Sequence, residues 1–202
     1  MAPSMYISPR YFDNCPSLEL KKFFRETPWP HLVLDNFLTA DIFEKAADEV
    51  LSYSYDFECS ERGTSRIEYS LLQSVTLWNV FYSAEFIALL QSAFDHRITL
   101  DRRNLIQLRR MTESTPEFPL HNDYREGTDH LVSFLYLSDD WAESKGGRLV
   151  MYDSELSSAT PVYLEPFANR LLVFRTASTH WHKVEQTVGW TRLSILAAWS
   201  IN

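Results

Sequence analysis

The amino-acid sequence predicts a mainly β fold, a jelly roll or barrel, supported by helices from its N-terminal part. From about Asn104 onward, short apolar runs alternate with turn residues such as the pair Gly146–Gly147, a pattern typical of an antiparallel domain of many short strands. The runs are LIQLRRM, LVSFLYL, GGRLVMY, RLLVF and RLSILAAW. A chain of 202 residues, 45% of them hydrophobic, suits one core, so we expect a single domain over residues 1–202.

The chain divides into three segments that differ in composition and in the spacing of apolar residues. Residues 1–30 carry scattered prolines and no clear period, which predicts an irregular N-terminal arm. Residues 31–103 are expected to supply supporting strands and helices, beginning with the β-rich run HLVLDNFL. Residues 104–202 are expected to form the jelly-roll core and to carry the active site.

Two helices are expected in the middle segment. The first has a cap at Thr39 or Asp41, and its apolar residues then recur at helical spacing. The second follows Ser83, a favourable N-cap, and runs through EFIALLQSAF. Both helices have one apolar side, so we expect them to pack on the β core as supports.

Charge and cysteine content disfavour several classes of protein. Nineteen Lys and Arg residues against 27 Asp and Glu give a net charge of −8, the wrong sign for binding nucleic acid or an anionic membrane. No apolar stretch approaches the roughly 18 residues of a membrane span, and the first residues lack a signal-peptide pattern. Cys15 and Cys59 are too few for a disulfide framework. We expect a soluble cytoplasmic protein; the sequence leaves the oligomeric state open.

Histidines and a carboxylate occur at spacings that suit a metal site. His121 and Asp123 are two residues apart in LHNDY, so in an extended segment both side chains lie on one face of a sheet. His180 and His182 are related in the same way, and either can supply a second imidazole. Two histidines and one carboxylate form the facial triad that binds iron(II) and leaves coordination positions open. The alternative is that H-x-D occurs here by chance.

An arginine follows in the last apolar run. In TRLSILAAW, Leu193 and Ile195 alternate with Arg192 and Ser194, so Arg192 and Ser194 are expected to share a face. An inward arginine is costly unless an anion meets it. A guanidinium suits a carboxylate ligand, and the neighbouring hydroxyl can add a hydrogen bond. The alternative is an Asp or Glu of the protein as its partner.

Taken together, these segments resemble the iron(II) and 2-oxoglutarate dependent dioxygenases, within them the prolyl 4-hydroxylase-like branch. The resemblance extends from about Pro30 to Trp199 and is close from Gln107 onward. The matching segments are HND, LVSFLYLSDDW, GGRLVMY, NRLLVF, HKV and RLSILAAW. The resemblance implies a double-stranded β-helix (jelly roll) that uses Fe(2+), 2-oxoglutarate and dioxygen, with ascorbate as a candidate stimulant.

The resemblance also implies roles for individual residues. The implied iron ligands, and hence the catalytic residues, are His121, Asp123 and His182. Arg192 would bind the distal carboxylate of 2-oxoglutarate, and Ser194 would assist. Tyr136 aligns with a tyrosine that in relatives often hydrogen-bonds the same carboxylate; the alternative is a core aromatic with its hydroxyl at the barrel edge. His182 is favoured over His180 because HKV matches the family and lies ten residues before Arg192.

Other positions are candidates for substrate contacts. Many relatives carry a tyrosine where this chain has Met111, so that contact to the cosubstrate is missing or replaced. Gln107 and Arg109 share the strand face of Met111, and Arg109 could bind an acidic substrate or the cosubstrate, or form a surface ion pair. His180 is expected at the pocket rim, touching substrate or water, or as a hydrogen-bonding residue that orients a ligand. Residues 113–125 and the GTDH loop are expected to flank the entrance.

The resulting expectation is a hydroxylase. It would act on an unactivated C–H bond of an amino acid, peptidyl residue or small metabolite and release succinate and carbon dioxide. Two alternatives stay open: a catalytically inactive jelly-roll binding or sensor protein, and a metal-dependent hydrolase that uses the same two histidines and aspartate. An inward Arg192 has no required role in a hydrolase.

Overall fold

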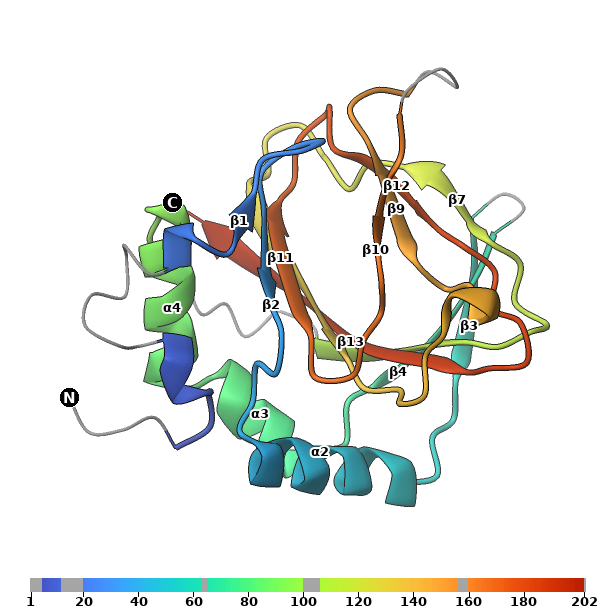
Figure 1. The fold of residues 1–202 in the computed structure, drawn as a ribbon, viewed down its shortest axis with the longest axis horizontal. Helices are drawn as coiled ribbons and strands as arrows, with labels where there is room; N and C mark the ends of the chain where they lie inside the picture. The colour runs from blue at the N-terminus through green and yellow to red at the C-terminus, as the bar shows by residue number, and fades with distance from the viewer. Residues whose placement is uncertain (1–4, 12–19, 63–64, 100–105, 156–159, 202) are drawn as a thin grey trace.

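The computed structural model describes residues 5–11, 20–62, 65–99, 106–155 and 160–201, and within them two antiparallel sheets face each other (Figure 1). The large sheet has the order β1 (Phe24–Arg25), β2 (His31–Leu34), β11 (Leu171–Arg175), β8 (His130–Tyr136), β13 (Arg192–Ile201), β6 (Ile106–Met111), β4 (Ser65–Leu71) and β3 (Glu58–Arg62), and β5 (Ile98–Thr99) pairs with β13. The small sheet has the order β10 (Val162–Leu164), β9 (Leu149–Tyr152), β12 (Trp181–Val184) and β7 (Phe118–His121).

The predicted jelly roll is confirmed by how consecutive strands are distributed. Of the strands from β6 to β13, β6, β8, β11 and β13 lie in the large sheet, and β7, β9, β10 and β12 lie in the small one. This is the double-sheet arrangement of a jelly roll. Strands β2, β3, β4 and β5, from the segment expected to be supporting, extend the large sheet. Two short 3-10 helices, η1 (Pro9–Tyr11) and η2 (Glu143–Lys145), lie in connections.

Helices cover the outer face of the large sheet. Figure 1 shows α2 (Ala40–Ser52), α3 (Val75–Phe81) and α4 (Ala84–Phe94) on one side of the molecule and the small sheet on the other. The two expected helices are confirmed: Thr39 is the N-cap of α2, and the Ser83 hydroxyl accepts a hydrogen bond from the Phe86 amide at the start of α4. None of the described helices is both long and apolar enough to cross a membrane.

The alternation expected for the last strand is observed. In β13, Leu193, Ile195 and Trp199 belong to the core cluster shared with the helices. Arg192 and Ser194 face the opposite way, into a cavity between the sheets. A second core cluster, with members from both sheets such as Met111, Met151 and Phe174, fills the remaining space between them. The same strand therefore anchors the fold with one face and presents polar groups to the cavity with the other.

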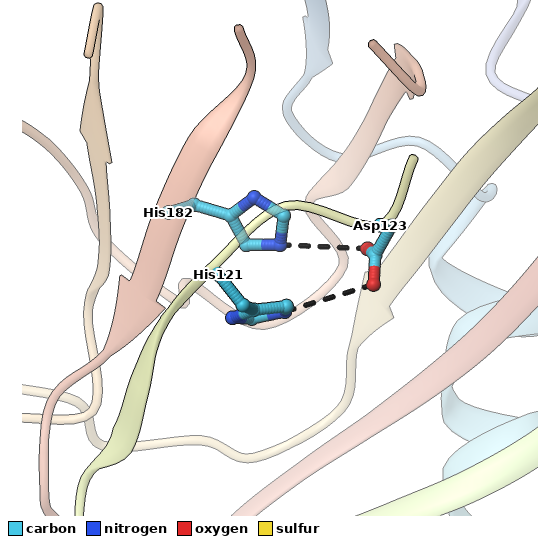
Figure 2. Close-up of side chains that lie close together, drawn as sticks. All are labelled: His121, Asp123 and His182. Carbon is cyan, nitrogen blue, oxygen red and sulfur yellow. Dashed lines mark ion pairs between the residues drawn. The ribbon is translucent and has the colours of Figure 1, made fainter. Parts of the chain in front are cut away.

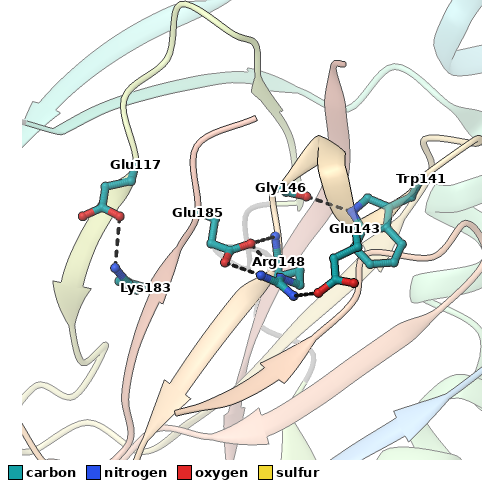
Figure 3. Close-up of polar contacts among 7 residues, drawn as sticks. All are labelled: Glu117, Trp141, Glu143, Gly146, Arg148, Lys183 and Glu185. Atoms are coloured by element: carbon teal, nitrogen blue, oxygen red, sulfur yellow. Dashed lines mark hydrogen bonds and ion pairs between the residues drawn. The ribbon is translucent and has the colours of Figure 1, made fainter. Parts of the chain in front are cut away.

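Ion pairs on the outer face of the small sheet hold β12 between its neighbours (Figure 3). The Arg148 guanidinium binds Glu185 (Nε–Oε2 2.8 Å) and Glu143 (Nη1–Oε1 3.1 Å). Lys183 Nζ lies 3.1 Å from Glu117 Oε2, and this hydrogen bond raises the pKa of Lys183. Because side chains alternate along a strand, the outward position of Lys183 directs the neighbouring His182 into the cavity.

The glycine pair before β9 allows a close backbone approach. Gly146 has φ 62° and ψ −148°, a region essentially restricted to glycine, and a Cβ there would lie 2.3 Å from the Gln186 carbonyl oxygen. A Cβ on Gly147 would lie 3.1 Å from both Thr187 and Trp190 and 3.4 Å from Arg192 Cδ. The pair thus lets the start of β9 approach the connection that leads into β13.

We therefore predict that Gly146→Ala lowers the free energy of unfolding by about 3 kcal/mol, through backbone strain plus the steric clash. For a chain of this size that lowers the unfolding midpoint by roughly 6–12 °C. Gly189→Ala is the matched control, because Gly189 has φ 57° but nothing within 4 Å of its added Cβ; it should cost about 1 kcal/mol. Equal losses in the two variants, measured by thermal and denaturant unfolding, would show that the close approach at Gly146 is unimportant.

Candidate active site

Two histidines face each other across neighbouring strands of the small sheet. His121 is the last residue of β7 and is paired with His182 of β12 in the ladder. Asp123 follows two residues after His121 and approaches both rings: its carboxylate oxygens lie 3.6 Å from His121 Nε2 and 3.5 Å from His182 Nε2 (Figure 2). The three candidate ligand atoms all lie within 4.8 Å of one another. We call these three residues the triad.

Backbone carbonyls orient both imidazole rings. His121 Nδ1 lies 2.8 Å from the Pro119 carbonyl oxygen, and His182 Nδ1 lies 3.0 Å from the carbonyl oxygen of His180. A ring nitrogen that faces a carbonyl oxygen donates a hydrogen bond to it, so Nδ1 is the donor in both rings and Nε2 is the atom that faces Asp123. Metal-binding histidines are commonly fixed in this way. Two imidazoles and one carboxylate are a donor set that suits a non-heme iron(II) ion, so the residues present fit a metal.

The triad is enclosed on one side and open on the other. The His182 side chain is 2% exposed, whereas the side chains of His121 and Asp123 are 22% and 30% exposed. Phe118 packs edge-to-face on His121 with ring centroids 4.5 Å apart, and Phe174 packs on His182 at 5.4 Å. The small sheet and the aromatic rings therefore leave the open side of the triad directed toward a cavity.

That cavity has a volume of about 340 Å³ and joins the triad to Arg192. The triad and the residues Arg192 and Ser194 line it together with apolar side chains such as Phe134 and Leu196. A space of this size is in the range of small-ligand sites, which are mostly apolar with a few placed polar groups. The residues that the sequence analysis assigned to the metal and to an anion thus share one cavity.

Arg192 is a buried cation without a carboxylate partner among the described residues. It is 3% exposed, its Nη1 donates to Ser194 Oγ at 3.3 Å, and its Nε has no hydrogen-bond partner in the described part of the chain. Arg170 provides an internal comparison: it is 4% exposed, but Asp35 and Glu165 bind its guanidinium. Since an unpaired buried charge is costly, Arg192 fits an anionic ligand in the cavity.

Tyr136 lies beneath Arg192. The guanidinium carbon of Arg192 is 5.0 Å from the centre of the Tyr136 ring, and the buried Tyr136 hydroxyl has no hydrogen-bond partner among the described residues. Tyr136 pairs with Ser194 in the ladder, although it is not among the residues lining the cavity. A buried hydroxyl without a partner costs about 1–3 kcal/mol, so an acceptor on a ligand beside Arg192 would satisfy it.

Three further residues, predicted from the sequence to share one face of β6, differ in whether they line the cavity. Arg109 lines the cavity, lies opposite Ser194 in the ladder, and its guanidinium is 5.4 Å from the centre of the Tyr69 ring. Met111 is paired with Arg192 and lines the cavity, with its sulfur 4.0 Å from Arg192 Nη1. Gln107 lies further along β6, opposite Leu196, and is not among the described lining residues.

His180 lies just before β12 and outside this cavity. Its ring stacks on Trp29, with centroids 4.6 Å apart and planes at 17°, and its Nδ1 lies 2.7 Å from the Arg175 carbonyl oxygen. Burial lowers the pKa of His180. The residue lines a neighbouring hollow, which shares Thr128 and Thr176 with the main cavity.

Several lining residues were not singled out from the sequence. They include Val132, Phe134, Thr176 and Val184. The period-2 pattern could have indicated Val132 and Phe134, because they share a face of β8 with Tyr136. Four residues of the segments expected to flank the entrance also line the cavity: Phe118, Arg125, Thr128 and His130. Thr176 follows β11 and carries no signal in the sequence.

Solved structures with the same fold include two prolyl hydroxylases. A prolyl-4-hydroxylase from Pseudomonas putida is 18% identical with a TM-score of 0.68, covering 85% of this chain and 92% of its own. A Trichoplax adhaerens prolyl hydroxylase, solved with a hypoxia inducible factor peptide, is 17% identical with a TM-score of 0.64, covering 85% and 83%. The carbocyclase SnoK of nogalamycin biosynthesis is 12% identical with a TM-score of 0.64, covering 90% and 83%. At these identities the likeness is one of fold.

A family model identifies the segment that carries the site. The model described as the 2OG-Fe(II) oxygenase superfamily matches residues 106–200, which run from β6 to β13 and contain the triad, Tyr136 and Arg192. No curated protein sequence matches the chain significantly. The donor set of the triad agrees with the iron(II) that this superfamily uses. Residues 106–200 are thus identified as a 2OG-Fe(II) oxygenase domain, and the protein is a dioxygenase that uses iron(II), 2-oxoglutarate and dioxygen.

Proposed function

We propose that this dioxygenase is a hydroxylase in which the triad holds iron(II) and Arg192 holds 2-oxoglutarate. One observation carries the proposal: the triad and a buried guanidinium without a described carboxylate partner line the same cavity. In this assignment Arg192 and Ser194 bind the distal carboxylate, and the Tyr136 hydroxyl donates to the same group. A metal-dependent hydrolase has no required role for a buried Arg192, and the presence of the whole triad together with Arg192 argues against an inactive binding protein.

The residues of the chain contribute orientation, charge and exclusion of water. Bound iron(II) and 2-oxoglutarate supply the oxidising chemistry: one oxygen atom of dioxygen enters succinate as carbon dioxide is lost, and the other converts a substrate C–H to C–OH. The backbone carbonyls of Pro119 and His180 hold the two Nε2 atoms toward the metal position. Asp123 offsets one positive charge there, and the apolar walls of the cavity limit access of water.

The lining supports a substrate that carries an anionic group. Arg109, Arg110 and Arg125 line the cavity in addition to Arg192, and Arg110 Nε also lies 2.7 Å from Glu68 Oε2. Guanidinium groups bind carboxylates and phosphates well, so we assign Arg109 to the substrate. An amino acid or a peptidyl residue is our first choice, supported by the fold shared with prolyl hydroxylases; a small metabolite is the second. The net charge of −8 argues against nucleic acid.

The proposed function is tested by coupled turnover. Purified protein with iron(II), 2-oxoglutarate and air is incubated with panels of amino acids and peptides, and succinate and hydroxylated product are quantified by NMR and mass spectrometry. The proposal requires succinate formation that rises with one class of substrate and matches product in a ratio near one to one. Absence of succinate under all conditions would refute it. Addition of ascorbate to the same assay tests its predicted stimulation.

The two neighbouring histidines should behave differently. His182→Ala should abolish iron(II) binding and succinate formation, because it removes a ligand. His180→Ala should still bind the metal, with affinity within about tenfold of the wild type, since only a neighbouring contact is lost. Metal content and titration of the two purified variants check this. Loss of iron only from His180→Ala would reverse the assignment of the ligand.

Arg192→Ala should act chiefly on the cosubstrate. Removing one partner of a buried charge pair costs about 2–5 kcal/mol, which corresponds to roughly 30-fold to several-thousand-fold weaker 2-oxoglutarate binding. Metal binding should survive, because Arg192 does not contact the triad in the described structure. Anaerobic titration of 2-oxoglutarate into the metal-loaded variant measures the effect, and unchanged affinity would place the carboxylate elsewhere.

A further inference from the structure

Trp29 connects the N-terminal part of the chain to the triad. It lies in the connection between β1 and β2, is 4% exposed, and donates its Nε1 hydrogen to the Tyr152 carbonyl of β9 at 3.0 Å. Its ring stacks on His180 at 4.6 Å and contacts the edge of the His182 ring, with centroids 6.3 Å apart and planes at 66°. It also packs on Phe174 at 5.0 Å. The Trp29 side chain therefore contacts β9, β11 and β12 around the buried His182.

The local sequence restricts the backbone at Trp29. Pro28 and Pro30 flank it, and a proline disfavours helical conformations in the residue before it. The Trp29 carbonyl oxygen lies 2.8 Å from His31 Nδ1, and His31 is fully buried in β2. Since β2 pairs with β11 in the large sheet, the position of the indole is fixed by the core of the fold.

The two metal-facing histidines are held by different means. His121 is oriented by the carbonyl of Pro119, which belongs to the same strand, β7. His182 is oriented by the carbonyl of His180, which lies outside β12 and follows a turn where the His180 amide donates to the Ala177 carbonyl. The His180 ring is held by the Arg175 carbonyl on its Nδ1 and by Trp29 on its face. The carbonyl that orients His182 therefore depends on a turn that Trp29 covers.

We propose that Trp29 is a positioning residue of the metal centre. By stacking on His180 and packing on the edge of His182, it keeps the His180 carbonyl at Nδ1 of His182, so that Nε2 of His182 faces Asp123. This inference rests on the proposed role of His182 as a ligand. Partners that orient a metal ligand typically affect metal affinity by 10- to 100-fold, so the geometry predicts that a change at Trp29 weakens the metal centre although all three ligands are present.

The test measures cobalt(II) binding, because its visible absorption reports ligand geometry independently of turnover. Trp29→Phe keeps an aromatic ring in the core but removes the bond to Tyr152 and part of the surface stacked on His180. Trp78→Phe is the matched control. Trp78 also donates its Nε1 hydrogen to a backbone carbonyl, that of Leu72 at 2.9 Å, and stacks on Tyr82, but it lies in α3 and packs on the other core cluster. Unfolding midpoints of both variants are recorded alongside.

We expect Trp29→Phe to bind cobalt(II) about tenfold more weakly than the wild type and to change its visible spectrum. Trp78→Phe should bind cobalt(II) within twofold of the wild type even if its unfolding midpoint falls as much. His180→Ala should weaken binding by a similar factor to Trp29→Phe, and the double variant by no more than the stronger single one, because both act through the same turn. If the factors by which the two single substitutions weaken cobalt(II) binding multiply in the double variant, Trp29 and His180 do not act through the same turn, and that part of the proposal is wrong.

Two further outcomes would overturn the proposal. Wild-type affinity and spectrum in folded Trp29→Phe would show that the indole does not position the ligand. An equal loss in Trp78→Phe would assign the effect to general destabilisation. Failure of the proposed function is recognised separately: if His182→Ala binds cobalt(II) like the wild type, His182 is not a ligand, and both proposals fall together.

Discussion

The pairing of β7 with β12 is the constraint on which the rest of the site depends. It places His121 directly opposite His182, at a separation where cross-strand side chains meet. Asp123 can then approach both rings from the loop that follows β7. A slip of one residue would turn His182 to the outer face. The ion pairs of Lys183 and Arg148 on that outer face oppose such a slip, so polar contacts away from the cavity protect the geometry inside it.

The second determinant is a charge that the described protein leaves uncompensated. Arg170 and Arg192 are buried to a similar degree, yet carboxylates bind only the first of them in the described part of the chain. The Arg170 ion pairs connect the start of β11 to the end of β2, whereas the uncompensated charge of Arg192 destabilises the folded protein until an anion binds. Sites that break a local stability rule in this way are expected to be functional. The buried hydroxyl of Tyr136 beneath Arg192 follows the same logic.

The β core and one face of its last strand could be predicted from the sequence because period-2 alternation is a local property. The facing of Arg192 and Ser194, and the helices after Thr39 and Ser83, follow from such patterns. Helix α3 could not be predicted: VTLWNVF favours a strand by composition, and the helix depends on its Ser74 cap and on Glu49 of α2, which binds Ser74 and Thr76. Local pattern equally cannot show that the hairpin of β3 and β4 extends the large sheet.

Within the site, what the sequence could predict again depended on distance along the chain. His121 and Asp123 are two residues apart, so the sequence could predict that their side chains point in the same direction. Periodicity could not separate His180 from His182; the structure separates them because β12 starts between them, at Trp181. The contact of Trp29 with Tyr152 spans 123 residues, and no local pattern indicates it. That Tyr136 lies beneath Arg192 instead of lining the cavity depends on the depth of packing, which a motif does not contain.

The central claim is that the triad and Arg192 form one site for iron(II) chelated by 2-oxoglutarate. Anaerobic addition of iron(II) and then 2-oxoglutarate to the purified protein tests it most directly. We predict a weak visible charge-transfer band that appears only when both are present and saturates at one equivalent of each. Absence of this band from folded protein that has bound stoichiometric iron(II), at saturating 2-oxoglutarate, would contradict the claim.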